Sequence, residues 1–380
     1  MVERSRAFGR GLLHGIVQYS NLYGPWLFYI QPEFYRKSRE QSYKWMKDLD
    51  ADGIIAYTWD AKLVEMMVDF GLPAMIRGID KPTGNSYCIT TDQVAIGSMA
   101  ARYFIERGFQ QFAYCGYDDM AWSRRRGENF SKVPGELGFE TFFYRQPKAK
   151  RLRTADKEQA SIAQWLSSLP KPIAVMASND DRSQDVLAGC KIAGLEVPRE
   201  VAILGVDNDE LLCGISYPQL SSIALSIERA GYEAARVLDK LMKRQELSDN
   251  EKQVTISPLN VVTRQSTDIM TVEDKYVAEA VHFIRKHTRD VIQVSDVAQA
   301  VGLSRRALEK RFRTALARPV HDEIKFTRVN QMANMLIGTN LPISQVARLL
   351  GYPDVSNISR YFKQLKGMSP LEYRKKFAPK

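Results

Sequence analysis

A chain of 380 residues, 44% of them hydrophobic and 26% charged, is long enough for two or three globular domains. No apolar run reaches the roughly 18 residues that cross a bilayer, the start "MVERSRAFGRG" has no apolar secretion segment, and the four cysteines form no C-x-x-C pair. We therefore expect a cytoplasmic protein with no metal site, no cofactor, no disulfide framework and no membrane association.

The net charge of +10 is confined to the end of the chain. Residues 271–380 contain 20 Lys and Arg against 10 Asp and Glu, which leaves 34 residues of each sign in residues 1–270. This asymmetry favours a neutral region joined to a module that binds a polyanion. The alternative is a solvated basic surface without a partner, but the charge is rich in Arg and clustered.

Short apolar segments alternate with stretches of helical periodicity along the neutral region. The predicted strands are 26–30, 53–58, 73–79, 112–117, 172–178 and 201–207, and the clearest helices are 9–24, 94–109 and 182–195. Several helices end in glycine, as expected at a C-terminal cap: Gly71, Gly108 and Gly194. The alternation predicts parallel sheets that are covered by helices on both faces.

Polar side chains follow four of the predicted strands, where ligands of open parallel sheets bind. Asp92 follows "YCITT", Asn179 and Asp180 follow "AVMAS", and Asp207 and Asn208 follow "AILGV". Trp122 and Arg126 follow "FAYCGYDDMA". Carboxylates, amides, a guanidinium and an aromatic face suit a small polyhydroxylated ligand. Taken singly, each Asp or Asn is equally consistent with a turn or a helix cap.

The segments "TTDQVAIGSMAARYFIERGFQQFAYCG", "MASNDDRSQDVLAGCKIAGLEVPREVAILGVDNDELLC" and "PQLSSIALSIERAGYEAARVL" resemble the sugar-sensing core of LacI/GalR-type regulators. The resemblance implies a two-lobed core like that of periplasmic binding proteins over residues 1–265, with hinges near 117–121 and 221–226. It also implies ligand contacts by Asp92, Arg126, Asn179, Asp180 and Asp207.

The beginning of the chain departs from that family. LacI-type regulators begin with a helix-turn-helix, and their first strand precedes the helix that here starts near residue 9. Only "MVE" is available for that strand. We expect the first lobe to lack a central strand as the chain stands, or the true start to lie upstream.

Residues 294–316, "VSDVAQAVGLSRRALEKRFRTAL", have the pattern of a helix-turn-helix. Ser295 is the predicted cap of a short helix whose inward residues include Val297, Gly302 permits a left-handed turn, and Ser304 caps the second helix. On that helix Leu308 and Phe312 face inward. The residues left outward are Arg305, Arg306, Glu309, Lys310 and Arg313.

Residues 343–365, "ISQVARLLGYPDVSNISRYFKQL", repeat the pattern 49 residues later. Gly351 takes the place of Gly302, Asp354 is the predicted cap, and Ile358 and Phe362 replace Leu308 and Phe312. The outward residues are Ser356, Asn357, Arg360 and Lys363. We expect a scaffold helix at 276–288 before the first copy and a linking helix at 321–337 between the copies.

The repeat and the tail "FKQLKGMSPLEYRKKF" resemble the AraC-family DNA-binding domain, here at residues 275–380 after a linker at 266–274. The resemblance implies double-stranded DNA as a partner, with two helices in successive major grooves. We expect Arg305, Arg306 and Glu309 nearer the bases, with Lys310 and Arg313 nearer phosphates. In the second copy Asn357 and Arg360 are expected at bases and Lys363 at a phosphate. Arg311 is expected to pack or pair within the protein, and the alternative for the whole region is a helical oligomerisation module.

A LacI-type core followed by an AraC-type tail resembles the xylose-operon regulators, whose effector is D-xylose. The resemblance implies a sugar-responsive activator that works as a homodimer with RNA polymerase. Another monosaccharide, or a sugar-binding module without DNA function, stays open as an alternative. An enzyme is disfavoured, because three of the four histidines lie in the basic tail and no G-x-S-x-G, P-loop or H-E-x-x-H occurs.

Overall fold

The computed structural model describes residues 5–29, 50–58, 60–78, 86–147, 154–248, 251–269, 274–288, 290–316, 318–352 and 355–377. The chain divides into two compact units, Met1–Asp92 with Ser226–Ser257 and Pro379–Lys380, and Gln93–Leu225 with Pro258–Ala378. Within the described residues it therefore passes between them after residues 92, 225 and 257. The second passage lies in the predicted hinge at 221–226, whereas residues 117–121, predicted as the other hinge, lie inside the second unit.

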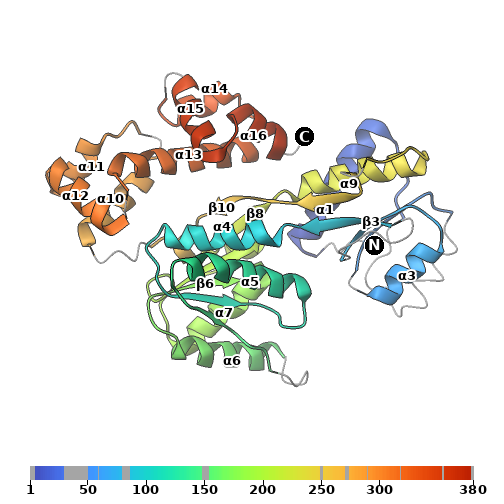
Figure 1. Ribbon diagram of the computed structural model, residues 1–380, viewed down its shortest axis with the longest axis horizontal. Helices are drawn as coiled ribbons and strands as arrows, with labels where there is room; N and C mark the ends of the chain where they lie inside the picture. The colour runs from blue at the N-terminus through green and yellow to red at the C-terminus, as the bar shows by residue number, and fades with distance from the viewer. Residues whose placement is uncertain are drawn as a thin grey trace. The chain divides into compact units, whose positions relative to one another are not determined.

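The first unit is built on a four-stranded parallel sheet of order β1-β2-β3-β9. Its elements are α1 (Ala7–Tyr23), β1 (Ile54–Tyr57), α3 (Ala61–Asp69), β2 (Ala74–Arg77), β3 (Ser86–Thr91), α9 (Ile227–Met242) and β9 (Gln253–Ile256). Helices α1 and α9 pack along each other, and Gly15 allows this because a Cβ there would lie 1.8 Å from the Glu228 carbonyl oxygen (Figure 1).

The predicted strand at 26–30 is wrong for Trp26–Tyr29, which lie in no strand, and Ile30 lies outside the described residues. Trp26 packs beside α1 instead. The Trp26 ring lies 5.8 Å from that of Tyr19, and the Trp26 backbone N–H donates to the Ser20 hydroxyl at 3.1 Å. Trp26 therefore serves helix packing and not sheet pairing, while Leu27, Phe28 and Tyr29 are exposed.

The second unit contains a six-stranded sheet of order β10-β8-β7-β6-β4-β5. Its elements are α4 (Gln93–Ile105), β4 (Phe112–Cys115), α5 (Ala121–Glu136), β5 (Thr141–Phe143), α6 (Ala155–Ser168), β6 (Ile173–Ala177), α7 (Asp180–Ala193), β7 (Val201–Asp207), α8 (Glu210–Ile215), β8 (Ser221–Leu225), β10 (Pro258–Val262) and a 3₁₀ turn at Gln265–Thr267. All neighbouring strands are parallel except β10, which pairs antiparallel with β8.

Helices cover both faces of this sheet, because successive strand residues point to opposite sides. Ala113 and Cys115 of β4 belong to a core that α6 and α7 complete with side chains such as Ile162 and Val186. Phe112, which precedes Ala113 on the strand, points the other way, and its ring lies 6.3 Å from that of Phe130 on α5. The predicted doubly covered α/β sheet is thereby confirmed.

The rest of the second unit is helical and has two small cores. Its helices are α10 (Lys275–Lys286), α11 (Val294–Ala300), α12 (Arg305–Leu316), α13 (Val320–Gly338), α14 (Ile343–Leu349), α15 (Val355–Lys366) and α16 (Pro370–Phe377). One core joins α10, α11 and α12 to the start of α13, and the other joins the rest of α13 to α14, α15 and α16 (Figure 1). The repeat seen in the sequence is therefore a repeat of packed units.

The turns of both helix-turn-helix copies depend on glycine. Gly302 and Gly351 have φ of 69° and 76°, a region that costs other L-residues about 1–2 kcal/mol. Leu308 and Phe312, and their counterparts Ile358 and Phe362, are fully buried as predicted.

The caps of the two copies agree with the prediction at one position and differ at another. Ser304 caps α12, accepting the Ala307 N–H at 3.2 Å, but Ser295 is not a cap. The cap of α11 is Gln293, two residues earlier, and the Asp296 carboxylate accepts the Gln293 N–H at 2.8 Å. The predicted cap at Asp354 lies outside the described residues.

Candidate functional site

The strand order of the second sheet places a candidate ligand site at the carboxyl ends of its strands, which we call the carboxyl edge. Strands β4 and β6 lie side by side in the centre, β5 follows on one side, and β7 and β8 follow on the other. Connections from β4 and β6 therefore leave in opposite directions, and the carboxyl ends of the two strands are the switch point where ligands of such sheets bind. The loops that follow β4, β6 and β7 all begin at this edge.

Trp122 and Arg126 stand on the first turns of α5, directly after the β4 loop. They are four residues apart and so share one face of the helix. The Arg126 guanidinium lies 5.1 Å from the centre of the Trp122 ring. It donates to the Gln93 side-chain oxygen at 2.8 Å and to the carbonyl of Ser178 at the end of β6. Arg126 therefore ties the β4 and β6 ends together and holds the indole in place.

Asn179 and Asp180 follow β6 and start α7. The Asn179 side-chain oxygen accepts the Arg182 N–H at 3.0 Å, so this residue is a helix cap, as the alternative reading of the sequence allowed. The cap uses only the oxygen, and the amide also carries an NH₂ group with two donors.

Asp180 points into the protein. It is 2% exposed and accepts the Ser222 hydroxyl at 2.6 Å and the Asp209 N–H at 2.7 Å. Burial, together with the nearby Asp207 carboxylate, raises the pKa of Asp180 well above its usual range, and these two hydrogen bonds oppose the shift. Each oxygen of the carboxyl group is thus engaged within the second unit.

The loop after β7 holds two residues in the left-handed region of backbone space. Asp207 has φ of 105° and Asn208 has φ of 51°. Such angles in non-glycine residues are costly and persist only where the surroundings enforce them. Here the Asn208 N–H donates to Ser222 at 3.0 Å, and the Asn208 side-chain oxygen accepts Arg264 at 2.9 Å. These contacts fix the loop that carries Asp207 at the edge of the sheet.

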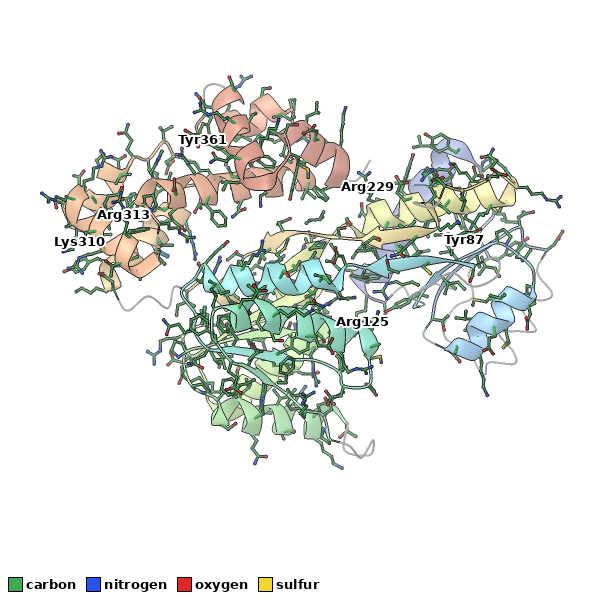
Figure 2. All side chains as sticks on the ribbon, in the orientation of Figure 1. Tyr87, Arg125, Arg229, Lys310, Arg313 and Tyr361 are labelled. Atoms are coloured by element: carbon green, nitrogen blue, oxygen red, sulfur yellow. The ribbon has the colours of Figure 1, made fainter. Side chains whose placement is uncertain are left out.

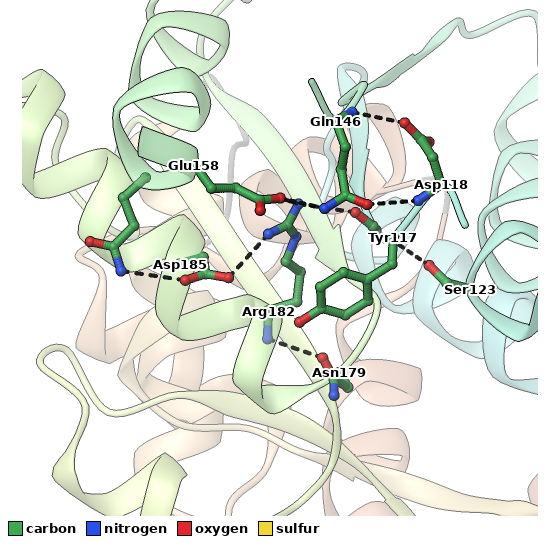
Figure 3. Close-up of polar contacts among 10 residues, drawn as sticks. Tyr117, Asp118, Ser123, Gln146, Glu158, Asn179, Arg182 and Asp185 are labelled. Atoms are coloured by element: carbon green, nitrogen blue, oxygen red, sulfur yellow. Dashed lines mark hydrogen bonds and ion pairs between the residues drawn. The ribbon is translucent and has the colours of Figure 1, made fainter. Parts of the chain in front are cut away.

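A buried polar network behind this edge was not predicted from the sequence (Figure 3). Arg182 is 1% exposed and lies 2.6 Å from Glu158 and 3.1 Å from Asp185. The Glu158 carboxylate also accepts Gln146, whose side-chain oxygen accepts the Asp118 N–H at 3.0 Å. The network thereby connects α6 and α7 to the loop after β4.

A second link in the same network runs through an aromatic ring. The Arg182 guanidinium lies 4.7 Å from the centre of the Tyr117 ring, which in turn lies 6.2 Å from that of Trp122. A cation in the first turn of a helix opposes the helix dipole, and this is the signal in the sequence that could have pointed to an internal carboxylate.

Asp92 belongs to the first unit. It directly follows β3, and its N–H donates to the carbonyl of Ile256 on β9 at 2.9 Å. The structure therefore brings Trp122, Arg126, Asn179, Asp180 and Asp207 to one edge of the second sheet, whereas Asp92 ends a strand of the first sheet.

The first recognition helix, α12, presents a basic face. Arg305, Arg306, Lys310 and Arg313 are exposed, and Figure 2 labels two of them, Lys310 and Arg313. Glu309 is half-buried, and one of its carboxylate oxygens has no hydrogen-bond partner among the described residues.

Arg311 lies on the same helix but pairs within the protein. Its guanidinium lies 2.6 Å from the carboxylate of Asp274, which also accepts the N–H groups of Tyr276 and Val277 at the start of α10. The expectation that Arg311 pairs within the protein is confirmed, and the residue fastens α12 to the scaffold helix.

The second recognition helix, α15, exposes Ser356, Asn357, Arg360 and Lys363. Arg360 donates to the Tyr361 hydroxyl at 3.4 Å, and Lys325 of α13 lies 4.5 Å from the centre of the same ring. The predicted outward residues are thus exposed in both copies, apart from the half-buried Glu309. Their contacts with DNA stay a prediction.

Two further observations concern metal sites and membrane spans among the described residues. No group of three or more His, Cys, Asp or Glu among them is placed to hold a metal ion. Within the same residues, none of the helices is long and apolar enough to cross a membrane.

Comparison with known families finds two successive domains along the chain. Residues 101–267 match a periplasmic binding protein-like domain, and residues 297–376 match a helix-turn-helix domain. The predicted α/β core and the predicted C-terminal helix-turn-helix domain are both confirmed.

Several characterised proteins are similar along their whole length. The xylose operon regulatory protein of Escherichia coli K12 is 28% identical over 98% of this chain and 95% of its own, and that of Haemophilus influenzae is 29% identical over 98% and 97%. A solved xylose-binding transcription activator matches 100% of this chain and 97% of its own, with 27% identity and a TM-score of 0.61.

Proposed function

Because the chain is a homologue of the xylose operon regulatory proteins, which are transcriptional regulators and not enzymes, we propose that it controls transcription in response to D-xylose or a related pentose. In this proposal the periplasmic binding protein-like domain takes the sugar, and the AraC-type helix-turn-helix domain takes double-stranded DNA. Activation together with RNA polymerase, as a homodimer, belongs to the same proposal.

Sugar binding is supported by the edge of the second sheet. Trp122 offers an aromatic face for the apolar side of a sugar ring, and Asn179 and Asp207 offer a donor amide and an acceptor carboxylate for its hydroxyls. Asp92 and Arg126 complete the proposed contact set. We assign Asp180 a supporting part, because its oxygens already hold Ser222 and the Asp209 N–H and so order the loop that carries Asp207.

DNA binding is supported by the two exposed helix faces. A basic helix supplies phosphate contacts that bind any sequence, and Arg, Asn and Glu side chains near base edges supply selectivity. Arg305, Arg306 and Glu309 are proposed at bases in the first copy, with Asn357 and Arg360 in the second. The remaining exposed residues, Lys310, Arg313, Ser356 and Lys363, are proposed at or near the DNA backbone.

The control step is proposed to be a shift of population between arrangements of the two units. A sugar that binds one arrangement more tightly shifts the protein towards it, and a sugar with equal affinity for all arrangements shifts nothing. The effect on operator affinity is therefore limited by the difference in sugar affinity between the arrangements.

The test combines calorimetry and DNA binding on the full chain. D-xylose, D-ribose, L-arabinose and D-glucose are titrated into the protein, and promoter DNA is then titrated with and without each sugar. We expect saturable binding of a pentose and at least a tenfold change in operator affinity in its presence. Identical operator affinity with and without every sugar would contradict the proposed control.

Asp207→Asn is the variant that tests the site. Asparagine tolerates a left-handed backbone and keeps the size of the side chain, but it removes the charge. Loss of one charged hydrogen bond, about 1.5–3 kcal/mol, should weaken sugar binding at least tenfold while DNA binding stays salt-sensitive. Asp156→Asn, an exposed change on α6, is the matched control. Unchanged sugar affinity in Asp207→Asn would show that the ligand contacts are wrongly assigned.

A further inference from the structure

A cavity of about 700 Å³ lies within the second unit, between the α/β part and the helical part. Its walls come from α4 and β10 on one side and from α13 and the end of α15 on the other. The volume is in the range of pockets that hold small molecules. None of Trp122, Asn179, Asp207, Arg306 or Arg360 lines it, so it is separate from the two sites proposed above.

Positive charge exceeds negative charge in the walls. Three acidic side chains, Glu106, Asp268 and Glu323, face six basic ones. The basic residues are Arg102, Arg107, Arg264, Arg285, Arg318 and Lys366. Arg285 pairs with Asp268 at 3.5 Å and Arg318 with Glu323 at 2.5 Å. Glu106 is then the one acidic lining side chain that faces the four remaining cations.

Two of the remaining cations, Arg107 and Lys366, donate to neutral acceptors. Arg107 is 6% exposed and donates to the Tyr103 carbonyl at 3.2 Å and the Thr263 hydroxyl at 3.4 Å. Burial lowers the pKa of Arg107 to about 10. Lys366 donates to the Asn330 side-chain oxygen at 2.8 Å, and burial lowers its pKa as well. Burial also raises the pKa of Glu106, and the neighbouring Arg318, Arg107 and Lys366 oppose the shift.

We propose that this cavity binds a small phosphorylated metabolite of sugar-phosphate size. A phosphate monoester carries close to two negative charges and three strong acceptor oxygens, which match an excess of basic side chains better than a single carboxylate does. Guanidinium groups such as those of Arg102 and Arg107 can bind phosphate oxygens in pairs, and the Lys366 ammonium adds a point charge.

The position of the cavity connects its occupant to both proposed functions. Arg264 lines the cavity and donates to Asn208, which adjoins Asp207 at the edge of the second sheet. On the opposite wall, α13 and α15 belong to the two helix-turn-helix cores. If DNA binds the same arrangement of these walls more tightly, the occupant raises the affinity for DNA, and DNA raises the affinity for the occupant by the same factor.

Calorimetry on the full chain tests the site without reference to sugar or DNA. The ligands are inorganic phosphate and D-ribose 5-phosphate, and chloride salt at the same ionic strength controls for screening. We expect saturable binding of D-ribose 5-phosphate to one site per chain, and unphosphorylated D-ribose should not compete. Tighter binding of inorganic phosphate than of the sugar phosphate, or no saturable binding of either, would overturn the proposal.

Three variants complete the experiment. Arg102→Gln changes an exposed side chain and should weaken D-ribose 5-phosphate binding at least threefold. Arg102→Gln combined with Lys366→Gln should weaken it at least tenfold. Lys191→Gln, an exposed change at the end of α7, removes the same charge outside the cavity and should leave the affinity unchanged. Equal affinities in all three variants would refute the site, whether or not the protein binds D-xylose.

Discussion

The guanidinium of Arg182 lies 2.6 Å from the carboxylate of Glu158, and both side chains are almost fully buried. The pair joins the first turn of α7 to the first turn of α6. Through Gln146 it also reaches the loop that follows β4, where the aromatic part of the proposed sugar site begins. The buried Arg182–Glu158 ion pair therefore supports the loops at the carboxyl edge of the second sheet.

Removal of Glu158 should destabilise the second unit strongly. Glu158→Ala leaves the Arg182 charge buried with only Asp185 as a close acidic partner, which should lower the free energy of unfolding by about 3 kcal/mol. Urea denaturation followed by circular dichroism measures this loss. Glu196→Ala breaks an exposed pair with Arg199 and should cost less than about 1 kcal/mol. Equal losses in the two variants would show that the buried network contributes no more than a surface pair.

The pKa of Asp180 makes a signed prediction about stability and pH. The pKa of Asp180 in the folded state is raised above its value in the unfolded state. The contribution of Asp180 to the free energy of unfolding is therefore fully present below the unfolded-state pKa, and it is lost as the pH rises through the folded-state pKa. Asp180→Asn is neutral at every pH and should lack this loss. The free energy of unfolding of the variant, relative to the wild type, should therefore increase as pH rises from about 4.

Urea titrations at several pH values measure the difference between Asp180→Asn and the wild type. Asp156→Asn on the exposed side of α6 controls for the loss of a carboxylate as such. A relative stability of Asp180→Asn that falls with rising pH would contradict the expected increase.

The basic face of α12 predicts two different effects on DNA binding. Lys310→Ala, proposed at a phosphate, should weaken binding to all sequences alike and reduce the slope of log affinity against log salt by about 0.9. Arg306→Ala, proposed at a base, should cost about 1–3 kcal/mol on the operator and relax selectivity at one position. Fluorescence anisotropy over a series of salt concentrations and operator variants distinguishes them.

Arg311→Ala is the control for these two variants, because its charge lies on the same helix but is paired with Asp274. It should leave the salt slope unchanged and lower the thermal midpoint instead. A salt slope reduced as much as in Lys310→Ala would mean that the Asp274 pair opens on DNA.

Gly302 should resist substitution for a backbone reason alone. A Cβ at this position would meet no atom within 4 Å, but φ is 69°. Gly302→Ala should therefore cost about 1–2 kcal/mol of unfolding free energy, and Gly302→Asn less, because asparagine tolerates this region.

Gly135 in α5 also has open space around it, without a positive φ, and Gly135→Ala should stabilise the protein by about 0.5–1 kcal/mol. Both free energies come from denaturant titrations. A neutral Gly302→Ala would show that the turn can relax to another conformation.

Much of the fold could be predicted because it depends on local patterns. The spacing of apolar residues marked α4, α7, β6 and β7, and the positions of Gly302 and Ser304 marked the turn and the start of α12. The outward face of α12 also follows from helical periodicity, since four of its five predicted residues are exposed. The strand expected at 26–30 failed because an aromatic run packs on a helix as readily as it enters a sheet.

By itself, the sequence determined the two-part organisation, the doubled helix-turn-helix and the residue types that end each strand, because these are properties of neighbouring residues and of charge. Only the tertiary structure decided which polar residues face inward. Asp180 was predicted as a ligand contact and Arg182 and Arg264 were not singled out, yet the hydrogen-bond partners of the three lie 42, 24 and 56 residues away along the chain. No local pattern encodes such pairs, because they form where strands and helices meet after folding.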